Sequence, residues 1–218
     1  LQSRGVRAEF VLDEGMVVVA GLPLASEPVA LIGVGEKGYA TLKVTAPAPG
    51  GHSSAPPPET GVETLARAVL AIADHDFPPR FEGPAAEMVR TLAADADWAV
   101  RMAVANEWLF RPLLVRQLSA TPAGAATLHT TIAPTMLRGS PKENVLPQDA
   151  TVWINYRIAP RDTSARVMER AKEATAGLDV HLEWDGPAYD PPPVSSSDSA
   201  AFALLAALAR DVTQAPVA

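Results

Sequence analysis

The chain has 218 residues, 48% of them hydrophobic, which is enough to bury the core of one domain and to supply additional segments. A formal net charge of -7 and an isoelectric point near 5.1 argue against a nucleic-acid partner, because such a partner requires clustered Lys and Arg. Cysteine is absent, which excludes disulfides and thiolate metal sites.

The N-terminal region has no features of a signal peptide or a membrane span. The chain starts at Leu1 without an initiator Met, and no basic stretch leads into an apolar one. The first long apolar run, residues 16–25, is about half of the roughly 20 residues that a spanning helix needs. We therefore expect no membrane association, and we expect the chain to be part of a longer protein.

Apolar runs predict three strands in the first part of the chain, at residues 8–12, 16–20 and 29–34. They show little polar alternation, which suggests strands that are buried on both faces, as in an α/β sheet. From Tyr39 the apolar residues instead alternate with polar ones, which predicts a half-buried strand. A Pro- and Gly-rich loop at residues 46–58 then leads into a predicted helix over 60–74.

The second half of the chain predicts two more strands, a helix and a last strand. Leu128, Thr130 and Ile132 indicate one strand, and residues 151–158 indicate the next. Asp162, Thr163 and Ser164 are candidate N-cap residues for a helix that ends near residue 176. Val180, Leu182 and Trp184 alternate in the final strand.

This order, β-α-β-β-α-β, predicts an α+β fold of the ferredoxin-like type, with two helices on one face of a four-stranded antiparallel sheet. Residues 79–125 interrupt it with a helical insert. Residues 191–199 form a connector rich in Pro and Ser. The helix predicted at 200–212 has an apolar face that requires a covering partner.

Three motifs occur in order along the chain. They are Gly-Gly-His-Ser-Ser at 50–54, Gly-Ser-Pro-Lys-Glu-Asn-Val-Leu-Pro at 139–147 and Ile-Asn-Tyr-Arg-Ile-Ala-Pro at 154–160. Together they resemble the lid domain of the zinc aminoacylase/carboxypeptidase family of metallopeptidases. Within that family, the sequence around residues 131–136 is most similar to carboxypeptidase S. Ser140 stands where the family usually has a second glycine.

The resemblance implies three segments. Residues 1–36 would be the tail of an α/β catalytic domain, 37–187 the lid and dimerisation domain with the insert at 79–125, and 188–218 a linker and the first helix that returns to the catalytic domain. The implied partners are an N-acyl amino acid or small peptide as the substrate, and a second copy of the chain through the lid.

His52 is the first candidate site residue. It lies in a glycine-containing loop from which an imidazole can project. From the sequence alone, a solvated loop histidine is the favoured interpretation, and the family resemblance reverses this preference. The resemblance implies that His52 reaches the active site of the partner subunit and stabilises the oxyanion that forms on the substrate carbonyl.

Asn144 and Arg157 are the implied substrate-binding residues, at the carboxylate end of the substrate. A guanidinium binds a carboxylate through two parallel hydrogen bonds. The alternatives are an Asn that stabilises a turn and a solvated Arg on the polar face of a strand, the face shared with Thr151, Trp153 and Asn155.

The segment at residues 10–15, which contains Asp13 and Glu14, resembles the family segment that carries the last acidic zinc ligand before the lid. Glu14 is favoured as the ligand over Asp13. Otherwise they form an ordinary polar strand end. The family's other ligands and its general base are not found in the sequence. The resemblance implies two zinc ions in the intact parent. Because the other ligands and the general base are missing, we expect no tight zinc binding or hydrolysis by this chain alone. The alternative function is a stand-alone ferredoxin-like module for self-association or ligand binding.

Overall fold

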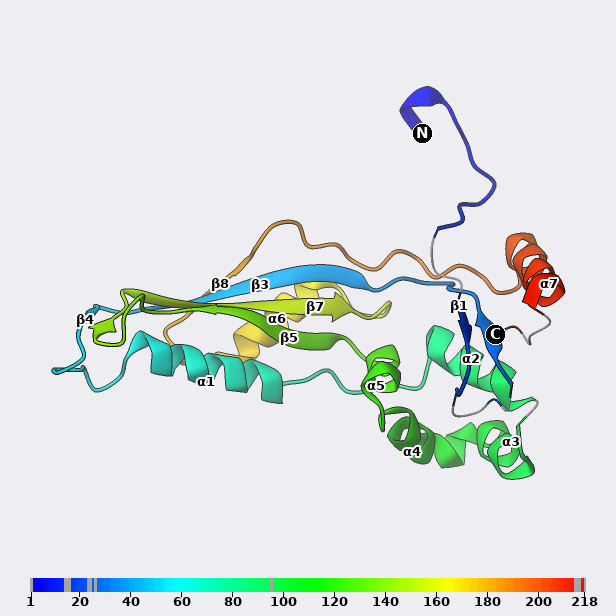
Figure 1. The fold of residues 1–218 in the computed structure, drawn as a ribbon, viewed down its shortest axis with the longest axis horizontal. Helices are drawn as coiled ribbons and strands as arrows, with labels where there is room; N and C mark the ends of the chain where they lie inside the picture. Colours follow the sequence, from blue (N-terminus) through cyan, green and yellow to red (C-terminus); the bar gives the residue numbers. More distant parts are fainter. Residues whose placement is uncertain are drawn as a thin grey trace. The chain divides into compact units, whose positions relative to one another are not determined.

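The computed structural model describes residues 2–13, 17–22, 25, 27–94, 96–213 and 217. The chain packs into two compact units (Figure 1). The first comprises Leu1–Gly35, Phe81–Leu114 and Val194–Ala218, and we call it the flanking unit. The second comprises Glu36–Arg80 and Val115–Pro193, and we call it the lid unit.

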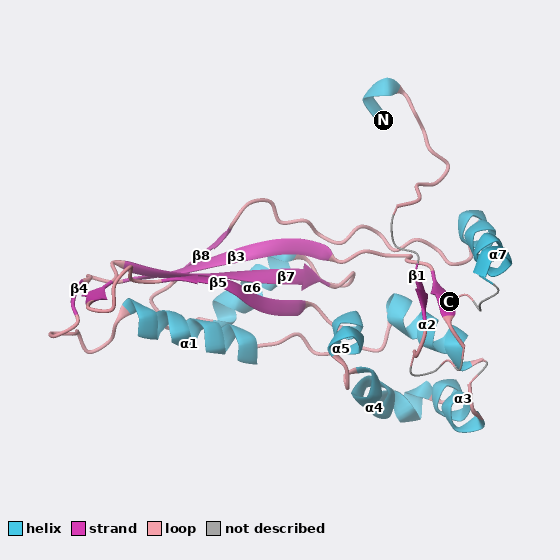
Figure 2. Cartoon of the chain, viewed as in Figure 1, coloured by secondary structure: helices cyan, strands magenta, loops and turns pink. Residues whose placement is uncertain are grey.

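The lid unit is built on a four-stranded antiparallel sheet with the strand order β5-β7-β3-β8 (Figure 2). Its strands are β3 (Gly38–Pro47), β5 (Thr131–Arg138), β7 (Asp149–Ile158) and β8 (His181–Trp184). The helices α1 (Gly61–Asp74) and α6 (Ser164–Ala174) pack against each other and against the sheet. The predicted β-α-β-β-α-β order and the α+β fold are thereby confirmed.

The core of the lid unit lies between the sheet and these two helices. Alternate residues of β3 and β7, such as Leu42 and its register partner Ile154, are fully buried. Leu65 and Ile72 of α1 and Val167 of α6 cover them. Fully burying one such side chain stabilises a protein by about 1.5–3 kcal/mol, so the period-two pattern of the strands accounts for the position of the sheet.

Threonine caps set the starts of both helices. The hydroxyl of Thr60 accepts from the backbone N of Glu63 at 3.3 Å, while the Glu63 carboxylate accepts from the backbone N of Thr60 at 2.7 Å. Of the three candidates for α6, Thr163 is the N-cap and accepts from the backbone N of Arg166. Asp162 instead accepts a hydrogen bond from the hydroxyl of Thr130.

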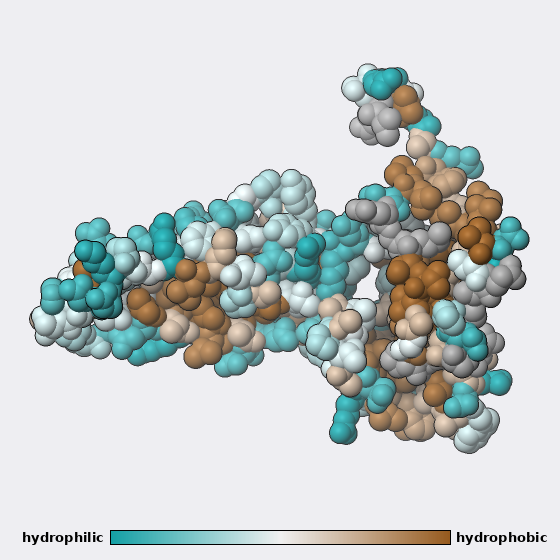
Figure 3. Space-filling view, viewed as in Figure 1, coloured by the Kyte–Doolittle hydropathy of each residue, from teal (hydrophilic) through white to brown (hydrophobic). Residues whose placement is uncertain are grey.

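β5 forms an edge of the sheet, and its second half is uncovered. Leu137 pairs with Val152, a core residue, so its side chain points to the helix side of the sheet, yet it is 70% exposed. Val62 and Leu70 of α1 are exposed as well. Figure 3 shows apolar surface over β5 and the adjacent part of α1. We call Val62, Leu70, Pro134 and Leu137 the edge patch.

The flanking unit contains a small antiparallel ribbon, a C-terminal helix and most of the insert. Its ribbon consists of β1 (Val17–Val19) and β2 (Val29–Leu31), and α7 (Ala200–Thr213) packs against β2 through Ala206 and Ala209. Its other elements are η1 (Gln2–Arg4), α2 (Gly83–Ala93), α3 (Trp98–Ala105) and the first part of α4 (Glu107–Leu118). No helix within the described ranges is both long and apolar enough to cross a membrane.

Three local predictions are wrong. Residues 8–12 form no strand and are exposed, since none of the described strands pairs with them. β1 exposes Val17 and Val18, so its apolar run does not mark a strand buried on both faces. Leu128 ends the helix α5 (Pro122–Leu128), which Thr121 caps and Pro122 begins, and the strand starts only at Thr131.

Candidate functional site

A two-stranded ribbon brings His52 and Asn144 together. β4 (Gly51–His52) pairs with β6 (Val145–Leu146), and the register sets His52 opposite Val145. The backbone N of Ser53 donates to the carbonyl of Asn144 at 3.1 Å. Two of the three motifs, which are about 90 residues apart in the sequence, therefore form one structural tip. We call this β4–β6 ribbon the tip.

Glycine makes the approach to His52 possible. Gly50 and Gly51 have φ values of 71° and 142°, a region in which a Cβ atom is strained. A Cβ at Gly50 would also lie 3.1 Å from the side chain of Gln148. The Gly-Gly pair thus turns the chain so that the histidine leaves the tip with its side chain exposed.

The imidazole of His52 is oriented by Ser54. Its Nδ1 accepts from the backbone N of Ser54 at 3.2 Å and lies 2.8 Å from the Ser54 hydroxyl. Because Nδ1 is an acceptor, the neutral ring carries its proton on Nε2. The Nε2–H group is then a hydrogen-bond donor at the end of the exposed side chain. This is the property that an oxyanion-stabilising histidine needs.

Arg157 lies on the polar face of β7 at the other end of the sheet. It pairs in register with Tyr39, and its guanidinium stands 4.9 Å from the centre of the Tyr39 ring. Lys37 and Arg161 lie near it. Burial, followed by the charge of Arg161, lowers the pKa of Lys37 to about 8; Asp162 opposes the shift, and Arg157 adds a smaller lowering effect. This end of the sheet therefore gathers three cations around one carboxylate, Asp162.

The tip and Arg157 are far apart within one chain. The pairing of β3 with β7 ends at Pro47 and Asp149, next to the tip, and Arg157 is eight residues further along β7 (157 − 149 = 8). At about 3.4 Å per residue, these eight residues span roughly 27 Å. The structure thus brings His52 and Asn144 together and separates both from Arg157.

The two acidic candidates are not part of either group. Asp13 is exposed and belongs to the flanking unit, and Glu14 lies outside the described residues. Among the described residues, no group of three or more His, Cys, Asp or Glu is close enough to hold a metal ion. The residues described here therefore do not by themselves fit a metal centre.

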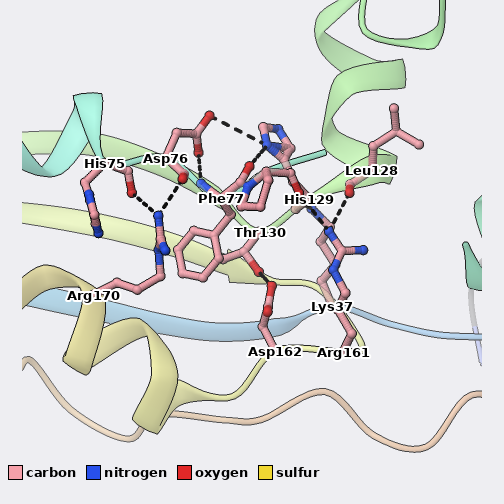
Figure 4. A network of polar contacts seen from close by, with 11 residues as sticks. Lys37, His75, Asp76, Phe77, Leu128, His129, Thr130, Arg161, Asp162 and Arg170 are labelled. Carbon is pink, nitrogen blue, oxygen red and sulfur yellow. Dashed lines mark hydrogen bonds and ion pairs between the residues drawn. The ribbon is translucent and has the colours of Figure 1, made fainter. Parts of the chain in front are cut away.

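A polar network, which the sequence did not indicate, joins the two segments that lead into and out of the insert (Figure 4). Lys37 donates to the carbonyl of His129 at 2.7 Å, and Arg161 donates to the carbonyls of Leu128 and Pro78. Arg170 donates to the carbonyls of His75 and Asp76 at 2.9 and 2.6 Å. Three cations thus hold the connections on either side of the insert through their backbone carbonyls, and His129 is part of this structural network.

His129 makes this network sensitive to acid. Its Nδ1 lies 3.0 Å from the carbonyl of Phe77, which only accepts, so the neutral ring donates from Nδ1. Burial, and then Lys37 and Arg161, lower the pKa of His129 below its ordinary value of 6.5, although Asp76 opposes the shift. The unfolded chain therefore takes up a proton at a pH where the folded chain does not.

We expect the melting temperature of the chain to fall as the pH decreases from 7 to 5, and His129→Gln to flatten this dependence. The folded state favours neutral His129, so the free energy of unfolding decreases once the pH drops below 6.5. The carboxyls with lowered pKa values, such as Glu63, begin to reduce the stability as the pH approaches 4.5, but this contribution is the same in the His129→Gln variant and cancels in the comparison. Equal pH dependence of the two melting curves would contradict the assignment.

Sequence reasoning missed two residues that shape the candidate site. Ser54 sets the tautomer of His52. The only signal for this contact in the sequence was that Ser54 follows His52 by two residues. Tyr39 lies beneath the guanidinium of Arg157, which follows from the β3–β7 register and not from either motif.

The chain matches a known family model and several curated proteins. The model described as a peptidase dimerisation domain, M20_dimer, matches residues 34–181. The protein named N-fatty-acyl-amino acid synthase/hydrolase PM20D1 of Xenopus tropicalis is 38% identical over 219 residues, which cover 99% of this chain and 43% of that protein. The human protein of the same name is 37% identical over 93% of this chain and 40% of its own length.

A protein of Dictyostelium discoideum, named probable carboxypeptidase S-like 2, is 31% identical over 90% of this chain and 38% of its own length. The chain therefore spans about two fifths of the length of these relatives.

Solved structures share the fold at low sequence identity. The M20 family metallo-carboxypeptidase Sso-CP2 from Sulfolobus solfataricus has a TM-score of 0.56 and 20% identity, over 86% of this chain and 52% of that chain. Human carnosine dipeptidase 1 has a TM-score of 0.53 and 11% identity, over 86% and 44% of the two chains.

Proposed function

This chain belongs to the M20 peptidase family through its peptidase dimerisation domain, and from this premise we propose that it is the lid and dimerisation part of a zinc-dependent hydrolase that cleaves the amide bond of N-acyl amino acids or small peptides. The membership confirms the resemblance that the three motifs indicated. The names of the relatives support a hydrolase, and those of the PM20D1 proteins favour a fatty acyl group in the substrate.

The observation that carries the proposal is the tip. It joins His52, with Nε2–H available as a donor, to Asn144, which directly precedes the neighbouring strand β6. Water attack on an amide carbonyl develops negative charge on the carbonyl oxygen, and a prepositioned N–H donor stabilises that charge. A solvated loop histidine would need neither the Ser54 contact nor the pairing of its strand with β6, which belongs to the second motif.

The cationic end of the sheet suits the other part of the same substrate. Arg157 can bind a carboxylate with two parallel hydrogen bonds, and Lys37 and Arg161 add positive charge nearby. The amide carbonyl and the carboxylate of one amino acid are separated by about one residue, roughly 3.5 Å, and not by the roughly 27 Å between the two groups of one chain. We therefore propose that the tip serves the active site of a second copy, while Arg157 serves its own.

Such an arrangement requires a homodimer, which the dimerisation domain supports. The edge patch is the surface that suits it, because β5 leaves one side of its backbone without a strand neighbour and carries apolar side chains on the helix side. Two copies related by a twofold axis can join edge to edge and cover the patch of each.

Metal dependence is part of the proposal, and its ligands are proposed to come mainly from outside this chain. The metal would activate water and polarise the amide carbonyl. Glu14, with Asp13 as the alternative, remains the proposed contribution of this chain. The 218-residue chain alone is then expected to be inactive.

The test is an assay of the longer protein on N-dodecanoyl amino acids, with and without a chelator, beside the 218-residue chain. We expect hydrolysis that a chelator abolishes, restoration by zinc, and no turnover by the chain alone. Chelator-resistant hydrolysis, or turnover by the 218-residue chain, would contradict the proposal.

Arg157→Lys in the longer protein is expected to raise KM roughly tenfold, about 1.4 kcal/mol, with little change in kcat, because a point charge cannot reproduce the bidentate fork. Arg166→Lys is the matched control, since Arg166 is an exposed residue of α6 that pairs with Glu169 and Glu173. Steady-state kinetics over a range of substrate concentrations measure both. An unchanged KM for Arg157→Lys would mean that Arg157 does not bind the substrate carboxylate and is a solvated arginine on the polar face of β7.

A further inference from the structure

The flanking unit contains a cleft of about 470 Å³ between α2 and α3. Its lining follows the helical period. On α3 it consists of Trp98, Arg101, Met102, Val104 and Ala105, and on α2 and its C-cap of Arg90, Ala93 and Ala94. The faces of two neighbouring helices thus line one open trough, and its volume lies within the range of about 300–1,000 Å³ of small-molecule sites.

The trough is apolar along its length. Ala93 and Val104 are buried, whereas Trp98 is 75% exposed and Met102 is 40% exposed. Trp98 and Met102 are one helical turn apart and stand on the same side of α3. A flat indole and a flexible thioether can adapt to an alkyl chain, whose shape varies by rotation about its bonds.

The two arginines of the cleft differ in their charge compensation. Arg90 forms a fork with Glu107, with its Nε and Nη2 at 3.0 and 2.9 Å from the two carboxylate oxygens. Arg101 makes no side-chain hydrogen bond or ion pair to any described residue. One guanidinium is therefore available to an anionic group, beside an apolar trough.

We propose that this cleft binds a single-chain amphiphile with a carboxylate head group, with the alkyl chain along Trp98 and Met102 and the carboxylate on Arg101. One free cation next to an apolar surface complements one anionic head on one apolar tail. A free fatty acid and an N-acyl amino acid share this chemistry. The cleft has no residue in common with the tip or with Arg157, and binding here requires no hydrolysis, so the site is tested independently of the proposed function.

The experiment titrates the 218-residue chain with octanoate, decanoate, dodecanoate and N-dodecanoylglycine below their critical micelle concentrations, and reads tryptophan fluorescence and binding heat. We expect the affinity to rise with chain length, by up to about fourfold per methylene. Dodecyltrimethylammonium, which has the same tail and the opposite charge, is expected to bind more weakly. Tighter binding of dodecanoate or of N-dodecanoylglycine identifies which of the two carboxylates the site prefers.

Variants assign the binding to the cleft. Arg101→Gln is expected to weaken dodecanoate binding by roughly tenfold, the effect of losing a hydrogen bond to a charged group. Arg116→Gln, an exposed arginine of α4 outside the cleft lining, is the matched control and is expected to leave it unchanged. Trp98→Phe should remove most of the fluorescence change while the binding heat persists. Circular dichroism confirms that each variant is folded.

Three results would overturn the proposal. The first is equal affinity for the carboxylate and the ammonium amphiphile. The second is binding by the 218-residue chain that disappears in the longer protein, which would mean that another part of the protein covers the cleft. The third is a decrease in oligomer size caused by Met102→Asp in the absence of ligand, which would make the cleft a contact between copies.

Discussion

Replacing His52 by Ala in the longer protein is expected to lower kcat for N-acyl amino acid hydrolysis by about 10²–10³-fold, the usual effect of losing one oxyanion donor. The Nε2–H group is available because Nδ1 accepts from Ser54, and Ala removes the donor without changing the glycine turn before it. KM should change little, since the contact strengthens mainly in the transition state. Initial rates at saturating substrate measure the effect.

His181→Ala is the matched control, because His181 is also an exposed histidine of the lid unit but lies on β8. It should retain the activity of the unchanged protein. Mixing the His52→Ala protein with a variant that lacks the general base tests whether the tip acts across a dimer. Restored activity in the mixture supports action across the dimer, and a kcat of His52→Ala within twofold of the unchanged protein would leave the loop histidine without a catalytic role.

The fold of the lid unit could be predicted from local signals. The alternation around Leu42 and Ile154 locates two central strands, and Thr60 locates the start of α1, because burial and capping act over a few residues. The errors lie in segments whose secondary structure depends on a partner that is distant in the sequence. Residues 8–12 have strand-like composition but no pairing strand among the described residues, and Leu128 has a strand-like neighbourhood but ends a helix that Thr121 starts.

The candidate site was predictable only in part for the same reason. The motifs named His52, Asn144 and Arg157, but the pairing of β4 with β6 depends on the register of two segments about 90 residues apart. The sequence gives no measure of the distance from the tip to Arg157, which follows from the full length of the β3–β7 ladder. That distance is what makes a second copy necessary to the proposed mechanism.

Leu137→Glu is expected to weaken the dimer by roughly 30-fold or more, the effect of losing a central interface residue. Leu137 faces the helix side of β5 and belongs to the edge patch, so in a dimer formed through this patch a carboxylate there would be removed from water and destabilise the contact. Sedimentation at a series of protein concentrations measures the dissociation constant. Because the side chain is 70% exposed in the single chain, the fold itself should be preserved.

Met136→Glu is the matched control. It is the preceding residue of the same edge strand and is also exposed, but its register partner is Trp153, on the polar face of the sheet. If two copies join through the edge patch, a carboxylate at residue 136 should raise the dissociation constant of the dimer far less than one at residue 137. Hydrolytic activity should then follow the dimer content, because the tip is supplied by the other copy. Equal dissociation constants for the two variants would place the dimer contact elsewhere, and full activity of a monomeric Leu137→Glu protein would show that His52 acts within its own chain.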